Sequence, residues 1–124
     1  MKKTVLLLLG LLAGCAQADW KEVTAQELVQ RQAAGEQLLV VDVRSRDEFA
    51  AGHVPGAINL PVDTVTGDEP TLKDFRQKPV VVYCHSGRRA AMAAKVLEAK
   101  GFTRIEHLSG DMQGWGQSGR PVAN

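Results

Sequence analysis

The sequence predicts an α/β domain built around a parallel sheet, and three features of the chain support this fold class. Short continuous apolar runs at residues 38–43 and 80–83 are typical of strands that a parallel sheet buries on both faces. Capping-box sequences at Thr24–Glu27 and Ser45–Glu48 predict helix starts beside these runs. Strand and helix patterns therefore alternate, which favours parallel pairing through right-handed crossovers.

The expected elements follow in chain order. A helix begins after Thr24 and stops at Gly35, with Leu28, Val29 and Ala33 at its apolar positions. The middle of the chain gives a strand over 38–43, one or two helical turns from Ser45 through Phe49, and a strand over 57–61 that a proline stops. An irregular stretch over 62–78 follows, with one short helix at 72–75. The last elements are a strand over 80–83, a helix over 90–100 capped by Gly101, a strand over 104–108 and a short helical turn over 112–115.

The size and composition of the chain limit what the protein can be. A chain of 124 residues with 44 % hydrophobic residues forms one domain that can bury its own core. No repeat, low-complexity tract or linker indicates a second domain. The 15 basic and 14 acidic residues leave no basic field for nucleic acid, and aromatic residues for base stacking are few. We therefore expect no nucleic-acid partner.

The N-terminus has the layout of an export signal. Two lysines precede an apolar run from Val5 to Ala13, which is too short to span a bilayer. One cleavage site at Ala16–Ala18 gives a signal over 1–18 and a soluble domain over 19–124. The alternative is Leu12–Cys15, which resembles the lipobox of bacterial lipoproteins and gives a signal over 1–14 with Cys15 lipidated. Both predict a protein of the bacterial periplasm or cell envelope, with a membrane contact only through a lipid on Cys15.

Either cut leaves Cys84 as the one free thiol of the mature chain, so an intramolecular disulfide is not expected. A thiol has a pKa of about 8.5, which falls at helix N-termini and beside cations. Cys84 lies where a strand pattern meets a helix pattern, and Gly87 permits a tight turn between them. The loop over 84–89 is thus a candidate anion cradle with a reactive sulfur.

The alternative for Cys84 is a buried core residue, because free cysteine is among the most buried residue types. A core cysteine usually lies within an apolar run, whereas this one is followed by His-Ser-Gly-Arg-Arg. The sequence context favours the reactive thiol.

The loop "CHSGRRA" (84–90) resembles the active-site loop of the rhodanese superfamily. "VVDVRSRDEFAAGHVPGAINLP" (40–61) and "KVLEAKGFTRIEHLSGDMQGWGQSGRPV" (95–122) are similar to two further family segments. The resemblance spans about Trp20 to Val122 and implies a three-layer fold with a central parallel sheet flanked by helices. One departure is visible, since the family often has a second glycine where this chain has Asp111. Aspartate tolerates positive φ, so we expect the local geometry to survive with an added negative charge near the substrate entrance.

The resemblance also implies a reaction. Related phosphatases have one more residue between cysteine and arginine, whereas the six residues from Cys84 to Arg89 suit a single sulfur atom. The implied reaction is a transfer of sulfane sulfur from a small anionic donor such as thiosulfate to cyanide or a thiol, through a persulfide on Cys84. No cofactor is implied.

The resemblance further implies roles for the residues around Cys84. The expected anion cradle comprises His85, Ser86, Gly87, Arg88 and Arg89. Within it, Arg89 faces the loop and holds its conformation, Arg88 meets the anionic donor, and His85 helps to set substrate preference. Each of these three side chains has the alternative of a solvated surface group without a role.

Other residues are expected to support the site rather than to react. Asp42 and Arg44 support the loop through hydrogen bonds and an ion pair. His53 is expected to be a packed, hydrogen-bonded histidine. Trp115 is expected to anchor the final segment in the core. No close-spaced pair of histidine or cysteine ligands is present, so we expect no metal.

Two other functions remain open at this stage. The first is a module that is not catalytic, in which Cys84 only carries sulfur delivered by a partner or the fold only binds that partner. The intact loop from Cys84 to Arg89 favours the enzyme. The second is a thiol redox or arsenate-reducing enzyme, which the six-residue loop and the lack of a resolving cysteine weigh against.

Overall fold

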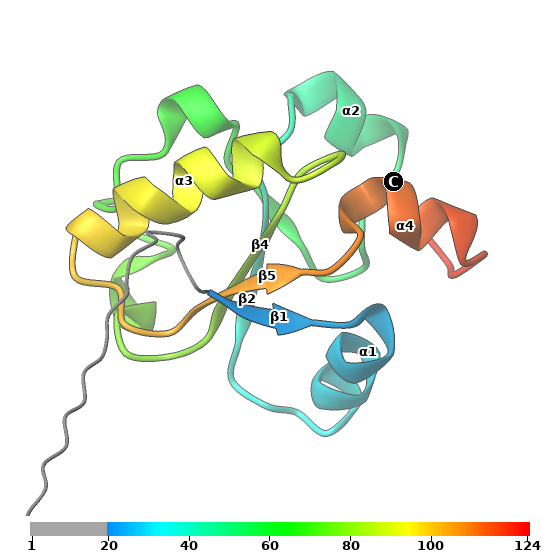
Figure 1. Ribbon diagram of the computed structural model, residues 1–124, viewed down its shortest axis with the longest axis horizontal. Coiled ribbons are helices and arrows are strands. Elements are labelled where there is room, and N and C mark those ends of the chain that lie inside the picture. The colour runs from blue at the N-terminus through cyan, green and yellow to red at the C-terminus, as the bar shows by residue number, and fades with distance from the viewer. Residues whose placement is uncertain (1–19) are drawn as a thin grey trace, which may run out of the picture.

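The computed structural model describes residues 20–124, and within them five strands form one parallel sheet (Figure 1). The strands are β1 (Lys21–Val23), β2 (Leu39–Asp42), β3 (Ile58–Asn59), β4 (Val80–Tyr83) and β5 (Ile105–Leu108). Their order is β1-β5-β4-β2-β3, and every neighbouring pair is parallel. The predicted α/β fold with a parallel sheet is therefore confirmed.

Helices cover both faces of this sheet (Figure 1). The α-helices are α1 (Ala25–Ala33), α2 (Arg46–Ala51), α3 (Arg88–Ala99) and α4 (Asp111–Gln117), and two short 3-10 helices are η1 (Val62–Thr64) and η2 (Lys73–Phe75). Both predicted capping boxes are present. Thr24 and Ser45 each accept the backbone N–H of a glutamate three residues later, whose carboxylate accepts the cap's own N–H. Two sequence-local signals thus fix where α1 and α2 begin.

The central strand β4 is buried on both faces, as its unbroken apolar sequence predicts. Val80 and Val82 pack with Ala93 and Leu97 of α3 in one core cluster. Side chains alternate along a strand, so Val81 and Tyr83 point the other way and pack with Leu28 of α1 and Trp115 of α4. The result is a three-layer domain, and Trp115 is a core residue as expected.

Most expected elements differ from the structure by a residue or two at their ends, and the stretch over 62–78 holds the two 3-10 helices η1 and η2 rather than one short helix. Three differences are larger or affect the site. The edge strand β1 was not predicted, because only Val23 of its three residues is buried and so short a segment shows no periodicity. Helix α3 begins at Arg88 rather than Ala90. The strand expected over 57–61 forms ladder pairs only at Ile58 and Asn59.

The export signal, both cleavage sites and Cys15 lie outside the described residues. Among residues 20–124 no helix has the length and apolar character that crossing a membrane requires.

Candidate active site

Cys84 directly follows β4, at the carboxyl end of the central strand, where open parallel sheets bind ligands. The chain turns within three residues and enters α3 at Arg88. Gly87 makes this turn possible, because its φ of 113° lies in the left-handed region that side chains disfavour. A Cβ at this position would also come within 3.3 Å of a carboxylate oxygen of Asp111. The turn therefore requires glycine.

The backbone of the loop donates a hydrogen bond to the sulfur of Cys84. The N–H of Gly87 donates a hydrogen bond to Sγ over 3.0 Å. Gly87 is also the N-terminal cap of α3, so the free N–H groups of the helix and its positive dipole end lie beside the sulfur. This arrangement stabilises negative charge on Sγ.

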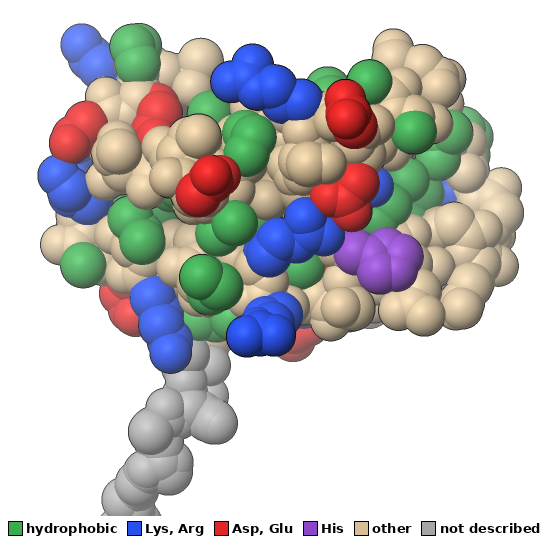
Figure 2. All heavy atoms as spheres, turned by 90° about the horizontal axis from the view of Figure 1, so that it is seen from above, with side chains coloured by type: hydrophobic (Ala, Val, Ile, Leu, Met, Phe, Trp, Pro, Cys, Tyr) green, Lys and Arg blue, Asp and Glu red, His purple; other side chains and the backbone are tan. Residues whose placement is uncertain are grey.

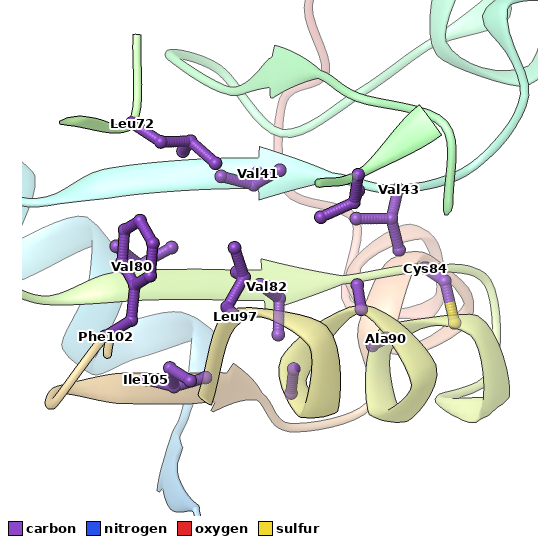
Figure 3. Packing of buried hydrophobic residues seen from close by; sticks show 13 residues of the cluster. Val41, Val43, Leu72, Val80, Val82, Cys84, Ala90, Leu97, Phe102 and Ile105 are labelled. Carbon is purple, nitrogen blue, oxygen red and sulfur yellow. The ribbon is translucent and has the colours of Figure 1, made fainter. Parts of the chain in front are cut away.

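Cys84 is nevertheless buried, with only 1 % of its surface exposed. It belongs to the core cluster on the α3 side of the sheet, together with Val43 and Ala90. Figure 3 shows the sulfur at the end of this row of side chains, over the first turn of α3. The two alternatives from the sequence thus combine, since the side chain packs in the core while its sulfur lies in the loop's cradle.

The other residues of the expected anion cradle differ in exposure, and one of them binds a neighbouring helix through its backbone. His85, Ser86 and Arg88 are exposed, and Arg89 is partly buried. The carbonyl of His85 accepts the N–H of Gln113, which ties the loop to α4. The loop therefore presents three side chains to solvent beside the buried Cys84.

Arg89 pairs with a carboxylate outside the loop. Its guanidinium donates to both carboxylate oxygens of Glu48, over 2.7 and 3.1 Å. The pKa of Glu48 is lowered to about 2, mainly by this hydrogen bond and, against the opposing effect of burial, also by the cap interactions with Ser45. Arg89 thus ties the start of α3 to the start of α2.

A cavity of about 480 Å³ opens beside this ion pair. It is lined by the first residues of α2, by η1 and by Arg89, with Arg44, Arg46, Asp47 and Asp63 among them. The cavity lining thus carries both basic and acidic side chains. Figure 2 shows the same mixture of both signs on the left and middle of the face seen from above.

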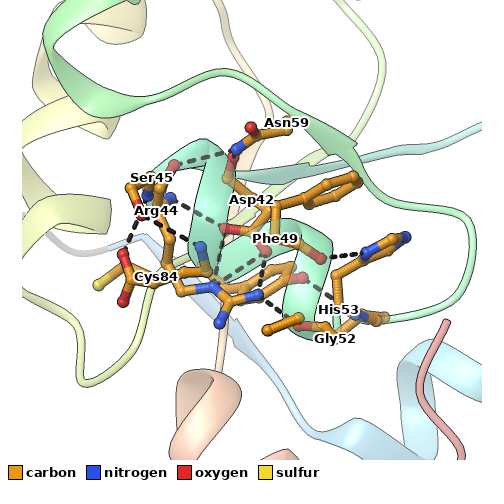
Figure 4. A network of polar contacts seen from close by, with 12 residues as sticks. Asp42, Arg44, Ser45, Phe49, Gly52, His53, Asn59 and Cys84 are labelled. Carbon is orange, nitrogen blue, oxygen red and sulfur yellow. Dashed lines mark hydrogen bonds and ion pairs between the residues drawn. The ribbon is translucent and has the colours of Figure 1, made fainter. Parts of the chain in front are cut away.

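Asp42 and Arg44 form the expected buried ion pair (Figure 4). Nε and Nη2 of Arg44 donate to the carboxylate over 2.7 to 3.0 Å, and Nη2 also donates to the carbonyl of Gly52. The amide of Asn59 bonds the carbonyls of both residues. The N–H of Val43 donates to the carbonyl of Tyr83, so the pair supports the Cys84 loop through the β2–β4 ladder.

His53 is packed and hydrogen-bonded as predicted. Its ring stacks on Phe49 with 3.5 Å between centroids, and Nδ1 lies 2.8 Å from the Phe49 carbonyl oxygen. In the described part of the chain no three histidine, cysteine or acidic side chains lie close enough together to hold a metal ion.

Sequence reasoning missed the residues beneath the loop. Asp111 adopts the expected positive φ, at 53°, and its carboxylate is buried. It accepts the backbone N–H of Cys84 over 3.0 Å. It also contacts His107, four residues earlier, which in turn contacts Glu22 on β1. The four-residue spacing of His107 and Asp111 could have indicated their contact. It was not informative in the sequence, because such spacing predicts a contact within one helix, whereas His107 is on strand β5 and Asp111 begins helix α4.

The comparison with known families decides the identity. The model of the rhodanese-like domain matches residues 24–118. This chain belongs to the rhodanese-like family. Its segments over 40–61 and 84–90, which carry the resemblance in the sequence, lie together at the carboxyl ends of β2 and β4.

Named relatives of this rhodanese-like domain include sulfurtransferases. A sulfurtransferase of Allochromatium vinosum is 33 % identical over 101 residues, which cover 82 % of this chain and 92 % of that protein. YrkF of Bacillus subtilis, whose name proposes a sulfur carrier, is 29 % identical over 94 residues, covering 76 % of this chain and 50 % of that protein. The solved thiosulfate sulfurtransferase of Pseudomonas aeruginosa aligns with a TM-score of 0.75 and 27 % identity, covering 82 % of this chain and 19 % of that one.

Proposed function

We propose that this rhodanese-like domain is a sulfurtransferase that takes sulfane sulfur from a thiosulfate-type donor and passes it to cyanide or a thiol through a persulfide on Cys84. The observation that carries this proposal is the hydrogen bond from Gly87 N–H to Sγ at the N-terminus of α3. Backbone N–H groups aimed at a sulfur stabilise both a thiolate and a persulfide anion.

The reaction has two steps. The Cys84 thiolate attacks the outer sulfur of thiosulfate, the S–S bond of the donor breaks, and sulfite leaves with the bonding electron pair. The cysteine then bears a persulfide. A cyanide ion or a thiolate attacks its outer sulfur, the new S–S bond breaks, and Cys84 is released as thiolate. Each half-reaction transfers one sulfur atom, so the kinetics are of the ping-pong type.

The side chains around the sulfur fit this chemistry. Arg88 is exposed beside the loop and can attract the anionic donor, and His85 is exposed next to the thiol. Arg89 is held by Glu48, so it supports the loop and leaves the backbone as the main binding group for charge on sulfur. This supports transfer of a single sulfur atom over the chemistry of a phosphate or arsenate, whose tetrahedral group needs arginine inside the cradle.

A sulfur-carrier role is the second candidate. The likeness to YrkF, whose name proposes a sulfur carrier, supports it. The burial of Cys84 weighs against it, because a sulfur with 1 % of the residue exposed is reached by a small reactant more easily than by a bulky acceptor. In this role Cys84 accepts sulfur from another protein and gives it up only to a specific partner.

Turnover separates the two candidates. The assay is thiocyanate formation from thiosulfate and cyanide by the domain over 19–124, run beside Cys84→Ser. Activity that vanishes in the variant supports the enzyme. A wild type without turnover, whose Cys84 still reacts with a thiol reagent, supports the carrier.

We also propose that the reaction takes place in the bacterial periplasm or cell envelope, on the strength of the N-terminal signal pattern. The mass of the mature N-terminus tests this. A chain that starts at Asp19 or at a lipidated Cys15 supports export, whereas one that retains Lys2 and Lys3 contradicts it.

A further inference from the structure

A buried carboxylate lies directly against the loop that holds the reactive sulfur. Asp111 is 3 % exposed, and its Oδ1 accepts the N–H of Cys84 over 3.0 Å. Its Oδ2 lies 3.3 Å from the place that a Cβ on Gly87 would take, and the N–H of Gly87 is bonded to Sγ. The next two N–H groups of α4 bond the carbonyls of Cys84 and His85. Asp111 is thus both a mechanical support and a negative charge beside the thiol.

The protonation of His107 follows from its contacts. Nε2 lies 3.0 and 3.1 Å from the two carboxylate oxygens of Asp111, and Nδ1 lies 2.9 and 3.0 Å from those of Glu22. A neutral imidazole donates from one nitrogen only, so one carboxylate would face a lone pair. The imidazolium donates from both nitrogens. The geometry therefore fits a positively charged His107 between two negative groups.

Glu22 holds the outer end of this chain of contacts. It is on the edge strand β1, opposite His107 in the parallel register, and the Ser109 hydroxyl donates to it over 2.9 Å. The other strand beside β5 has the apolar Val82 opposite His107. Among the described residues, the charged groups that face His107 are therefore Glu22 and Asp111.

We propose that Glu22, His107 and Asp111 form a positioning chain in which the imidazolium neutralises Asp111, so that this carboxylate holds the Cys84 loop without opposing negative charge on Sγ. Asp111 and His107 touch no substrate and act through the loop. The pKa of His107 is raised to about 9, mainly by the hydrogen bond with Asp111 and also by the one with Glu22, while burial opposes this rise. The ring therefore stays charged at neutral pH. The chain deepens the proposed function, on which it rests, because it concerns the reactivity of the same sulfur.

The test measures how fast Cys84 is alkylated by iodoacetamide, a neutral reagent, as a function of pH. His107→Gln removes the positive charge, and we expect alkylation at pH 7 to slow about tenfold because Asp111 is no longer neutralised. Asp111→Asn keeps an oxygen that accepts the Cys84 N–H but removes the negative charge. The double variant His107→Gln with Asp111→Asn should therefore return to within about threefold of the wild type.

The control is Glu106→Gln. Glu106 neighbours His107 on β5, is also a buried, ion-paired carboxylate, and contacts Arg31 of α1. Its loss lowers stability without a change beside the sulfur, so alkylation of the folded protein should stay at the wild-type rate. Nitrogen-15 NMR of the wild type is a second measurement that needs no variant, and it should show both ring nitrogens of His107 protonated at pH 7.

Three results would overturn the positioning chain. They are a double variant as slow as His107→Gln, a His107→Gln variant as fast as the wild type, and a neutral His107 ring at pH 7. The alkylation needs no sulfur donor. A wild type that alkylates readily but forms no thiocyanate would therefore contradict the proposed enzyme and leave the positioning chain standing.

Discussion

The buried pair of Asp42 and Arg44 gives the sharpest stability prediction. Arg44→Met keeps much of the side-chain volume but removes three hydrogen bonds to the Asp42 carboxylate and one to the Gly52 carbonyl. Asp42 is 0 % exposed, and the backbone N–H of residue 44 still donates to its carboxylate. A buried charge stripped of its partner costs about 3–5 kcal/mol. Domains of this size are stable by about 5–15 kcal/mol, so the variant should lose a large part of its stability.

Urea unfolding measures this loss as the free energy of unfolding extrapolated to water. Arg46→Met, at an exposed position two residues on, is the matched control and should change stability by less than about 0.5 kcal/mol. Asp42→Asn combined with Arg44→Met removes the stranded charge and should be more stable than Arg44→Met alone. A loss below about 1 kcal/mol in Arg44→Met, or a double variant less stable than the single one, would refute the reasoning.

Three further predictions follow from the loop and its supports. Gly87→Ala places a Cβ at φ 113° and 3.3 Å from Asp111, so it should cost about 1–2 kcal/mol and slow thiocyanate formation; wild-type turnover would contradict this. The pKa of His107 is about 9 in the folded protein, against 6.5 in an unfolded chain. Its charged form therefore adds about 1–3 kcal/mol to the free energy of unfolding below pH 6.5, and this contribution is lost as pH rises through 9. In urea unfolding, His107→Gln should not lose stability between pH 6.5 and 9 as the wild type does. An equal loss of stability in the variant would mean that another group causes it. The pKa of Glu48 falls from 4.5 to about 2, so its contribution is present above pH 4.5 and is lost as pH falls towards 2. Glu48→Gln should flatten the acid limb of the stability curve, and an unchanged acid limb would count against the Arg89 pair.

The sequence predicted the fold where the signals are local. The capping boxes at Thr24 and Ser45 and the apolar run of β4 each depend on a few neighbouring residues, and each appears as expected. The edge strand β1 did not show, because it is defined by pairing with β5, more than eighty residues away in the chain. Long-range pairing of a short, mostly exposed strand leaves no periodic pattern.

The site followed the same division. The turn at Gly87, the sulfur at the strand end and the Asp42–Arg44 pair could be expected from residues close together in the sequence. The partners of Arg89 and Asp111 could not, because Glu48 is 41 residues from Arg89 and Cys84 is 27 from Asp111. Asp111 was expected to add a negative charge near the substrate entrance, and the packing of α4 beneath the loop shows that this charge is buried against His107.

The most direct test of sulfur transfer through Cys84 is the intact mass of the protein after brief exposure to thiosulfate without acceptor. We expect the wild type to gain the mass of one sulfur atom, the gain to disappear when cyanide is added, and Cys84→Ser to stay unchanged. A wild type that gains no sulfur, or a Cys84→Ser variant that gains as much, would contradict a persulfide on Cys84.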